Sequence, residues 1–563
     1  MIEKLKKVFN TNYYIILIVS ILTIAPLLAK GAIIAHDAVY PVTRAIGTVM
    51  ALKQGQFLPL ITSNFANGFG YSWNLFYPPI STYFVIFARI FTSSYYNATK
   101  IVVILSTIFS GIFMYRLVKC VSKNDKISLL AAIIYITAPY RLVDIYTRMA
   151  IGEIISFIFI PIVFQGLYNL LEGDSDKHYL IVIGAVGLVL THNISTLMTI
   201  IPCIIYVLFN IKKLKNKNII KKLLIDIIFI IGMVVFFYAP MIEAKLSCNY
   251  SVFDDGKMGS LEQIQQQALS ISQVLFGKMQ NGYTASEMCL IIGLPIILPL
   301  IFTPYVYSKI SNKKLYVLTL ITGLLMLLAT TNIFPWIHMP KIFSFIQFAY
   351  SFLFLAIFLL SIVAAVNIEK MFEDIKIKEI FIVVFLIFIY IIPILNICQL
   401  DSNFNENRFT QVDTVNENTE ATESCAYFEY VPSNVKVSYL TSRKQEAIVL
   451  SGKTEIVEQN KENTNMNIKI QNTSEETLIE LPYIYYVGYK AEINGKKLNV
   501  KETENGLVGL DIPKGESGYI TIQYRGTKIQ KVSTLISIVS FVFFIVYIAN
   551  KGKGFKQKRL DIK

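Results

Sequence analysis

The chain has 563 residues, of which 54% are hydrophobic and only 16% are charged, and this composition excludes an ordinary soluble domain. The formal net charge of +14 would suit a nucleic-acid-binding protein, but the basic residues gather in short links between apolar runs. Such placement is typical of the cytoplasmic loops of membrane proteins and argues against nucleic acid as a partner. The sequence therefore predicts an α-helical polytopic membrane protein.

Apolar runs long enough to cross a bilayer recur from residue 13 to about residue 400 and once more near the C-terminus. The first run follows the basic stretch MIEKLKK and shows no small-residue cleavage site, which indicates a retained helix and not a cleaved signal peptide. With the basic links placed inside, both termini are expected to be cytoplasmic. We predict twelve spans, at 13–30, 99–119, 127–140, 153–171, 179–191, 194–210, 222–240, 287–308, 315–331, 342–366, 379–399 and 533–549.

The apolar segment 80–93 is short, contains Arg89 and follows two prolines. If it crossed the membrane fully, the later basic loops would fall outside, so we expect a re-entrant or interfacial segment, and full spanning stays open. Five polar loops then face the exterior together, namely 31–80, 140–153, 241–286, 332–341 and 400–532.

Residues 400–532 differ in composition from the rest, with 15 Lys and Arg against 19 Asp and Glu and no long apolar run. Alternating stretches such as NMNIKIQN and GYITIQYRG, joined by Asn-Gly and similar turns, predict short antiparallel strands. A β-sandwich of about seven or eight strands fits this spacing. We therefore divide the chain into a membrane domain at 1–399, an extracytoplasmic β-sandwich at 400–532, and a final helix with a basic tail at 533–563.

The first candidate site residues are His36 and Asp37, which leave the first span on the predicted outer side within GAIIAHDAVYP. A carboxylate that is partly desolvated there can have its pKa raised toward the range useful for a general base. The following stretch, YPVTRAIGTVMALKQGQ, has apolar residues at helical spacing and two cations, as expected of an interfacial helix. A solvated, inert Asp37 is the alternative, and a role for His36 stays open.

The second candidate group lies in APYRLVDIYTRMAIGE and comprises Arg141, Asp144, Arg148 and Glu153. If this loop is helical, the spacing i, i+3, i+7 places the first three on one face. Two guanidiniums on that face suit a lipid phosphate or pyrophosphate. A structural Arg–Asp–Arg network that reaches the headgroups explains the same pattern, and the two readings are compatible.

Two further pairs fall on the predicted outer face. His192 and Asn193 lie in the short break LTHNIS, and His338 and Lys341 lie beside Trp336 at the start of a later span. Imidazole and carboxylate side chains at residues 36, 37 and 192 are competent ligands for a divalent metal. No ligand-spaced pair such as HExxH occurs, however, so we predict no metal and no cofactor.

Several of these stretches resemble known families. GAIIAHDAVYP, WNLFYPPI, APYRLVDIYTRMAIGE and LTHNIS resemble the bacterial membrane proteins grouped as 6-pyruvoyl-tetrahydropterin synthase-related and, beyond them, the GT-C glycosyltransferase superfamily. The stretch from LPYIYYVGYKAEINGKKLNV to GYITIQY is similar to the outer β-domain of YfhO-type proteins. GT-C enzymes move a sugar from a polyprenyl-phosphate carrier to an acceptor outside the membrane, usually with a carboxylate of the first outer loop as catalytic group. The resemblance thus implies a catalytic Asp37.

The resulting hypothesis is a GT-C-type glycosyltransferase of the bacterial cytoplasmic membrane that uses a polyprenyl-phosphate-sugar donor. Its acceptor would be an envelope glycan, a teichoic-acid-type polymer or a protein. Two alternatives stay open, a lipid-linked-sugar transporter or flippase and a non-catalytic envelope assembly factor, although the near absence of ionisable residues in mid-span disfavours transport. The expected substrate-binding residues are His36, Arg141, Asp144, Arg148, Glu153, His192, Asn193, His338 and Lys341.

Overall fold

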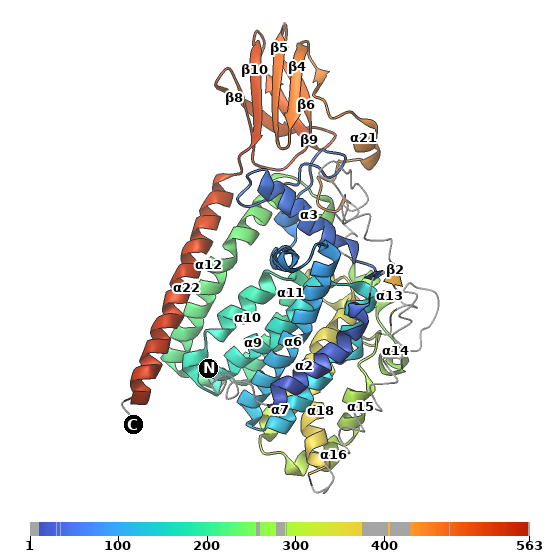
Figure 1. The fold of residues 1–563 in the computed structure, drawn as a ribbon, viewed down its shortest axis with the longest axis vertical. Helices are drawn as coiled ribbons and strands as arrows, with labels where there is room; N and C mark the ends of the chain where they lie inside the picture. The colour runs from blue at the N-terminus through green and yellow to red at the C-terminus, as the bar shows by residue number, and fades with distance from the viewer. Residues whose placement is uncertain are drawn as a thin grey trace.

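The protein consists of an elongated helical bundle with a β-domain at one end (Figure 1). A computed structural model describes residues 11–29, 31–33, 35–254, 259–276, 288, 290–373, 404–405, 428–471 and 473–560. The predicted span at 379–399 and the predicted domain boundary at 399 lie outside these residues.

Six helices of the described residues are long and apolar enough to cross a membrane. They are Thr11–Leu28, Tyr95–Ser122, Ile151–Leu171, Lys217–Ser247, Ala349–Met371 and Lys528–Lys551. A seventh candidate is a pair of helices, Asp125–Ile136 and Pro139–Arg148, bent by 41° at a short break. The chain is therefore a multi-pass membrane protein, but the predicted number of twelve spans is not confirmed.

Two of the predicted spans are too short or too broken to cross as single helices. α10 (Leu180–Val189) has 10 residues, or about 15 Å of helix against about 30 Å of hydrocarbon. The predicted span at 287–308 is divided into α15 (Leu294–Ile301) and α16 (Thr303–Val306), because prolines interrupt its backbone hydrogen bonds. The segment at 80–93 forms α5 (Ile80–Ala88) and a single 3-10 turn, and its depth stays untested.

The remaining elements of the bundle are arranged around two central helices. α9 (Ile151–Leu171) and α18 (Leu353–Met371) are the most enclosed, since 83% and 89% of the residues in their most apolar stretches are buried. α12 (Lys217–Ser247) and α22 (Lys528–Leu560) lie at the periphery, where the corresponding shares are 22% and 17%. The other helices are α2 (Thr11–Ile24), α3 (Val39–Lys53), α4 (Trp73–Phe76), α6 (Tyr95–Ser122), α7 (Asp125–Ile136), α8 (Pro139–Val143), α11 (Asn193–Phe209), α13 (Leu261–Gln267), α14 (Ile271–Phe276) and α17 (Lys313–Ala329).

The β-domain is one continuous antiparallel ladder of eight strands in the order β3-β6-β9-β8-β7-β10-β5-β4. The strands are β3 (Ile448–Ser451), β4 (Glu455–Glu462), β5 (Asn465–Gln471), β6 (Thr477–Ile484), β7 (Tyr489–Ile493), β8 (Lys496–Glu502), β9 (Leu507–Ile512) and β10 (Gly518–Tyr524). The predicted short antiparallel strands are confirmed. Instead of two separate sheets the domain is barrel-like, because β8 pairs with β7 through its first residues and with β9 through its last.

The β-domain sits on the loop that follows α3, and the two share one hydrophobic core. The Asn67 amide donates to Leu440 O at 2.6 Å, and Ile484 N donates to Phe69 O at 2.9 Å. Tyr71 and Trp73 are buried in the same core. α3 itself is covered on nearly all sides, so the helix expected along the membrane interface is instead largely buried beneath the β-domain.

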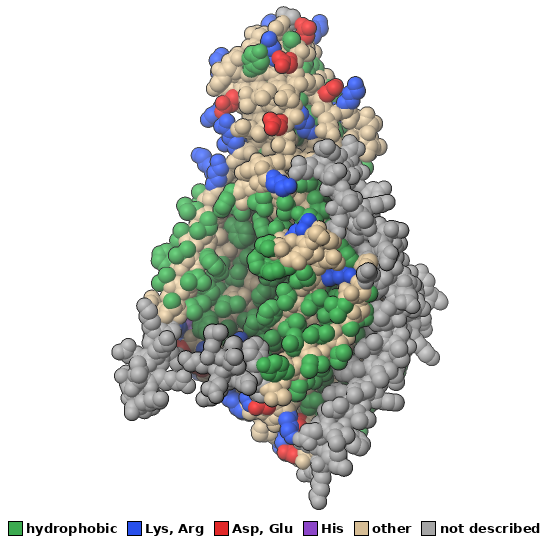
Figure 2. Space-filling model, in the orientation of Figure 1, with side chains coloured by type: hydrophobic (Ala, Val, Ile, Leu, Met, Phe, Trp, Pro, Cys, Tyr) green, Lys and Arg blue, Asp and Glu red, His purple; other side chains and the backbone are tan. Residues whose placement is uncertain are grey.

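The β-domain and the start of α2 mark two opposite ends of the molecule, and hydrophobic side chains lie between these ends. α22 leads away from the β-domain, and α2 begins at the opposite end (Figure 1). On the face drawn in Figure 2, hydrophobic side chains cover the helices, and charged side chains gather on the β-domain and at the opposite tip. Such a belt is expected of a protein that crosses the hydrocarbon core of a membrane.

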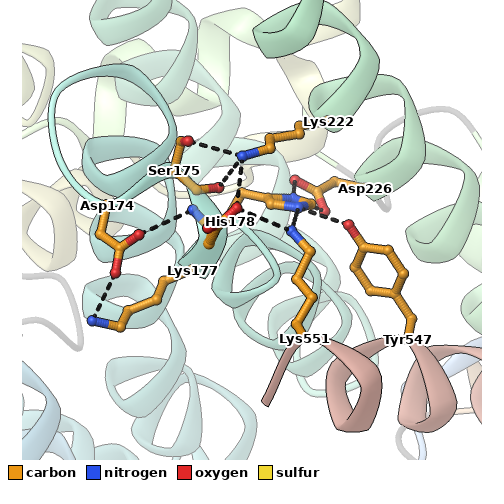
Figure 3. A network of polar contacts seen from close by, with 9 residues as sticks. Asp174, Ser175, Lys177, His178, Lys222, Asp226, Tyr547 and Lys551 are labelled. Atoms are coloured by element: carbon orange, nitrogen blue, oxygen red, sulfur yellow. Dashed lines mark hydrogen bonds and ion pairs between the residues drawn. The ribbon is translucent and has the colours of Figure 1, made fainter. Parts of the chain in front are cut away.

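A buried polar network joins α22 to the bundle at the end opposite the β-domain (Figure 3). The buried His178 contacts both carboxylate oxygens of Asp226 in α12 through Nδ1 at 2.8 Å. Its Nε2 lies 2.9 Å from the Tyr547 hydroxyl and 2.8 Å from the Lys551 ammonium, both in α22. Because Nε2 accepts from these donors, Nδ1 carries the proton that it donates to Asp226. The network therefore holds the peripheral α12–α22 pair against the loop after α9.

We expect His178→Ala to destabilise the full chain, because it leaves the Asp226 carboxylate buried without its partner, a change that costs about 3 kcal/mol or more. Thermal unfolding of the purified protein, followed by fluorescence, should show a midpoint lowered by several degrees. Lys177→Ala is the matched control, since its ion pair with Asp174 is roughly half exposed and worth about 1 kcal/mol at most. Equal midpoints for the two variants would show that the network does not hold α22.

Candidate functional site

The turn at His36 and Asp37 is fixed to a segment more than a hundred residues away. His36 N donates to Thr147 O at 3.0 Å, and Asp37 N donates to Arg148 O at 2.8 Å. Tyr40 N then donates to Asp37 O at 3.1 Å as the chain enters α3. The first and second groups of candidate residues are therefore adjacent, at the β-domain end of the bundle.

The segment that receives this turn has an irregular backbone. α8 begins at Pro139, which suits the first turn of a helix, and it continues as one π-helical turn, Asp144–Arg148. Met149 follows in the left-handed region with φ 53°, and Ala150 N donates to Asp144 O at 3.1 Å. Single π-turns occur preferentially at functional sites, because the extra residue re-aims the side chains that follow.

Arg148 is the centre of a nearly buried cluster of charges. Its guanidinium donates to Asp144 Oδ1, to Glu153 Oε2 at 2.9 Å and to the Tyr140 hydroxyl oxygen at 3.1 Å. Tyr140 in turn donates to Glu153 Oε1 at 2.8 Å, and the Tyr350 ring lies 5.5 Å from the guanidinium carbon. Buried carboxylates are stable only when they are paired, so Arg148 is needed to hold both of them.

The Arg141 side chain points away from the Arg148 cluster. It is fully buried in the bundle, with one terminal nitrogen 3.1 Å from Thr107 Oγ1 and the guanidinium carbon 4.6 Å from the centre of the Phe157 ring. It shares no hydrogen-bond partner with Arg148 in the described part of the chain. Because an α-turn is followed by a π-turn, the i, i+3, i+7 spacing does not give one common face.

The Asp37 side chain is half-buried. Within the described part of the chain, its carboxylate makes no hydrogen bond and no ion pair. Burial raises the pKa of Asp37 above its usual value, and the positive charges of Arg148, His36 and Arg44 oppose this rise. Glu153 adds a small effect in the raising direction. The preceding residue, His36, is exposed. A carboxylate with free lone pairs and a raised pKa has the properties of a general base.

His192, which caps the N-terminus of α11, lies beside the same cluster. Its Nδ1 accepts from Ser195 N at 3.3 Å and lies 2.7 Å from Ser195 Oγ, so Nε2 carries the proton. Burial lowers the pKa of His192 to about 4, with opposition from Glu153 and support from the charges of Arg148 and Arg44. His192 is therefore a neutral donor near neutral pH.

Gly152 is required for the close packing at this point. A Cβ at Gly152 would lie 2.7 Å from the Tyr77 hydroxyl, 3.0 Å from Thr191 O and 3.1 Å from His192 Cδ2. The start of α9 therefore touches both the α4–α5 segment and the α10–α11 break. Neither Gly152 nor Tyr77 was singled out in the sequence.

The other predicted residues lie farther from the cluster. Asn193 ties α11 to its neighbours, since its amide donates to Phe76 O at 3.5 Å and its Oδ1 accepts from the Tyr238 hydroxyl at 3.1 Å. His338 and Lys341 are exposed in the 3-10 turns Trp336–His338 and Lys341–Ile346. Within the described residues neither contacts Arg148 or Asp37, and their part of the chain reaches the cluster through Tyr350 instead.

Sequence reasoning did not identify Arg44, which lies in the second turn of α3 and is 7% exposed. Its guanidinium carbon is 3.6 Å from the centre of the Tyr77 ring, and its Nε donates to Tyr40 O at 3.2 Å. A single arginine among small and apolar residues was the available signal, but the predicted surface position of this helix concealed it.

Cavities and metal ligands add little to this arrangement. Among the described residues, no group of three His, Cys, Asp or Glu side chains could hold a metal ion, and metal dependence stays untested. A cavity of about 380 Å³ lies between the loop at 56–60, α4, α12 and the start of α22. A second, of about 210 Å³, lies between α6, α11, α17 and α18. Neither is lined by Asp37 or Arg148.

No protein-family model matches the chain. An uncharacterized protein of Lactococcus lactis subsp. cremoris (strain MG1363) is 24% identical over 598 residues, which cover 98% of this chain and 97% of that protein. The uncharacterized protein YfhO of Bacillus subtilis (strain 168) is 29% identical over 106 residues, 19% of this chain and 12% of YfhO. The expected similarity to YfhO-type proteins is thus supported, whereas that to the 6-pyruvoyl-tetrahydropterin synthase-related group is not.

Among solved structures, the chain is similar to the arabinofuranosyltransferase AftD from Mycobacteria, with 12% identity and a TM-score of 0.39. The match covers 63% of this chain and 26% of AftD. At this TM-score the likeness carries no argument about activity.

Proposed function

We propose that this protein is a membrane glycosyltransferase that moves a sugar from a polyprenyl-phosphate-linked donor to an acceptor at the β-domain end of the bundle. One observation carries the proposal: the unpaired Asp37 carboxylate is held by backbone hydrogen bonds against the Arg148 cluster. A free base held in a fixed position is what deprotonation of an acceptor hydroxyl requires.

The proposed reaction is a single displacement. Asp37 accepts the proton of the acceptor hydroxyl as the acceptor oxygen forms its bond to C1 of the sugar. The bond between C1 and the phosphate oxygen breaks, and the lipid phosphate leaves with the bonding electrons. The anomeric configuration inverts, because attack and departure occur on opposite faces. Positive charge near the leaving phosphate stabilises the negative charge that develops there.

The surrounding residues suit subsidiary roles. The neutral His192 presents an N–H that can donate to the substrate, and the exposed His36 lies where an acceptor would approach from water. Glu153 and Asp144 hold Arg148 and, through its backbone, the turn that carries Asp37. In this proposal the β-domain faces outward and both termini are cytoplasmic, and the acceptor is an envelope glycan, a teichoic-acid-type polymer or a protein.

We expect Asp37→Asn to lower sugar transfer by about 10² to 10⁴-fold, the usual effect of removing a general base. The assay is transfer from a polyprenyl-phosphate-linked sugar donor by the full chain in proteoliposomes. Asp511→Asn, a half-exposed aspartate of the β-domain, is the control for a neutralised carboxylate. Undiminished turnover by the Asp37→Asn protein, at normal membrane level, would remove Asp37 from catalysis.

The pH dependence of kcat/KM separates Asp37 from His192. Because the pKa of Asp37 is raised, base catalysis is lost as the pH falls through a value above 3.8, where the carboxylate becomes protonated. The pKa of His192 is about 4, so its protonation alone would give a similar acid limb. We expect His192→Gln to keep the acid limb of the wild-type profile. Loss of that limb in His192→Gln would assign the titration to the imidazole.

A further inference from the structure

Three arginines of the described helical bundle, Arg44, Arg141 and Arg148, are buried or nearly buried at the β-domain end, and they differ in what they can bind. Arg148 already donates to two carboxylates and a tyrosine, and Arg141 is enclosed among Thr107, Ile154 O and the Phe157 ring. An anion at Arg148 would lie beside the two carboxylates, whose negative charge repels it, and Arg141 is fully buried. Neither guanidinium is therefore well placed to receive a phosphate.

Arg44 differs in that no carboxylate is paired with its guanidinium among the described residues. Its face is stacked on the Tyr77 ring and its Nε is bonded to Tyr40 O. In the described part of the chain, its two terminal nitrogens have no hydrogen-bond or ion-pair partner. A buried arginine without a counter-ion costs free energy, and an oriented fork of N–H groups matches two phosphate oxygens.

The position of Arg44 relates it to the proposed reaction centre. Its charge acts on Asp37 in the first turn, on His192 in the α10–α11 break and on Tyr430 in the segment that enters the β-domain. No ion pair joins Arg44 to Asp37 among the described residues. Arg44 and Asp37 therefore lie close enough to interact electrostatically without being joined by an ion pair.

Resting on the proposed function, we infer that Arg44 binds the phosphate of the lipid-linked donor, whereas Arg148 is a positioning residue that holds the Asp37 turn. The stack on Tyr77 fixes the plane of the guanidinium, so that both terminal nitrogens can donate to one phosphate. The acceptor hydroxyl then lies at Asp37 and the leaving phosphate at Arg44, on the two sides of the reacting sugar carbon.

The test uses the full chain in phosphatidylcholine nanodiscs, with farnesyl phosphate as the probe and farnesol as its phosphate-free counterpart. We expect Arg44→Gln to weaken farnesyl phosphate binding by about 10 to 100-fold, since a charge-assisted hydrogen bond is lost, and to leave farnesol binding unchanged. Arg44→Lys, which keeps the charge but not the fork, should give an intermediate loss. Lys53→Gln, an exposed cation of the same helix, is the control.

The outcomes separate this inference from the proposed function. Wild-type affinity for farnesyl phosphate in both Arg44 variants would overturn the inference, and loss of transfer in Asp37→Asn would still support the proposed function. Loss of binding in the Arg44 variants together with an active Asp37→Asn protein would support the phosphate site and reject the catalytic role. Inorganic phosphate that displaces the probe at equal concentration would overturn the assignment to a lipid donor.

A second readout does not depend on affinity. Because the charge of Arg44 lowers the pKa of Asp37, its removal should move the acid limb of kcat/KM to higher pH in Arg44→Gln. In Arg44→Lys, which retains the charge, the limb should stay near its wild-type position. An unchanged limb in Arg44→Gln would show that the two groups do not share one region.

Discussion

The candidate site depends on the pairing of a short loop with an irregular helix. Asp37 and His36 donate their backbone N–H groups to Arg148 and Thr147, whose carbonyls are available because the π-turn ends there. The same Arg148 holds two buried carboxylates through its side chain. Arg148 thus fixes the position of Asp37 through its backbone and offsets part of the surrounding negative charge through its guanidinium. The geometry and the electrostatics of the site therefore depend on the same residue.

The β-domain contributes by fixing the loop that follows α3. Residues of that loop share a core with the β-strands, and Asn67 and Phe69 are hydrogen-bonded to the β-domain. α3 is held beneath this loop, and it carries Arg44 on the side of the charged cluster. The β-domain is therefore connected to the site through this loop and α3. At the far end of α22, the buried network at His178 anchors the helix that leaves the β-domain.

The arginines of this end illustrate why charge alone does not identify a ligand site. Arg141 and Arg148 are conspicuous in the sequence, but Arg141 is fully buried and Arg148 is paired with two carboxylates. Arg44 is less conspicuous, and a stack and a single hydrogen bond leave its terminal nitrogens open. Complete burial or pairing with an internal carboxylate, both of which depend on tertiary contacts, distinguishes a structural arginine from one that can bind a substrate.

The sequence by itself determined that this is a multi-pass membrane protein with an antiparallel β-domain, because apolar run length and residue alternation act locally. It also indicated that one end of the bundle would hold Asp37, Arg148, Glu153 and His192. The number of membrane crossings that precede a loop decides the end at which that loop lies. Only the tertiary structure decided which of these residues touch. The π-turn, the direction of Arg141, the burial of α3 and the stacking of Arg44 all result from contacts between segments far apart in the chain, and no local pattern encodes such contacts.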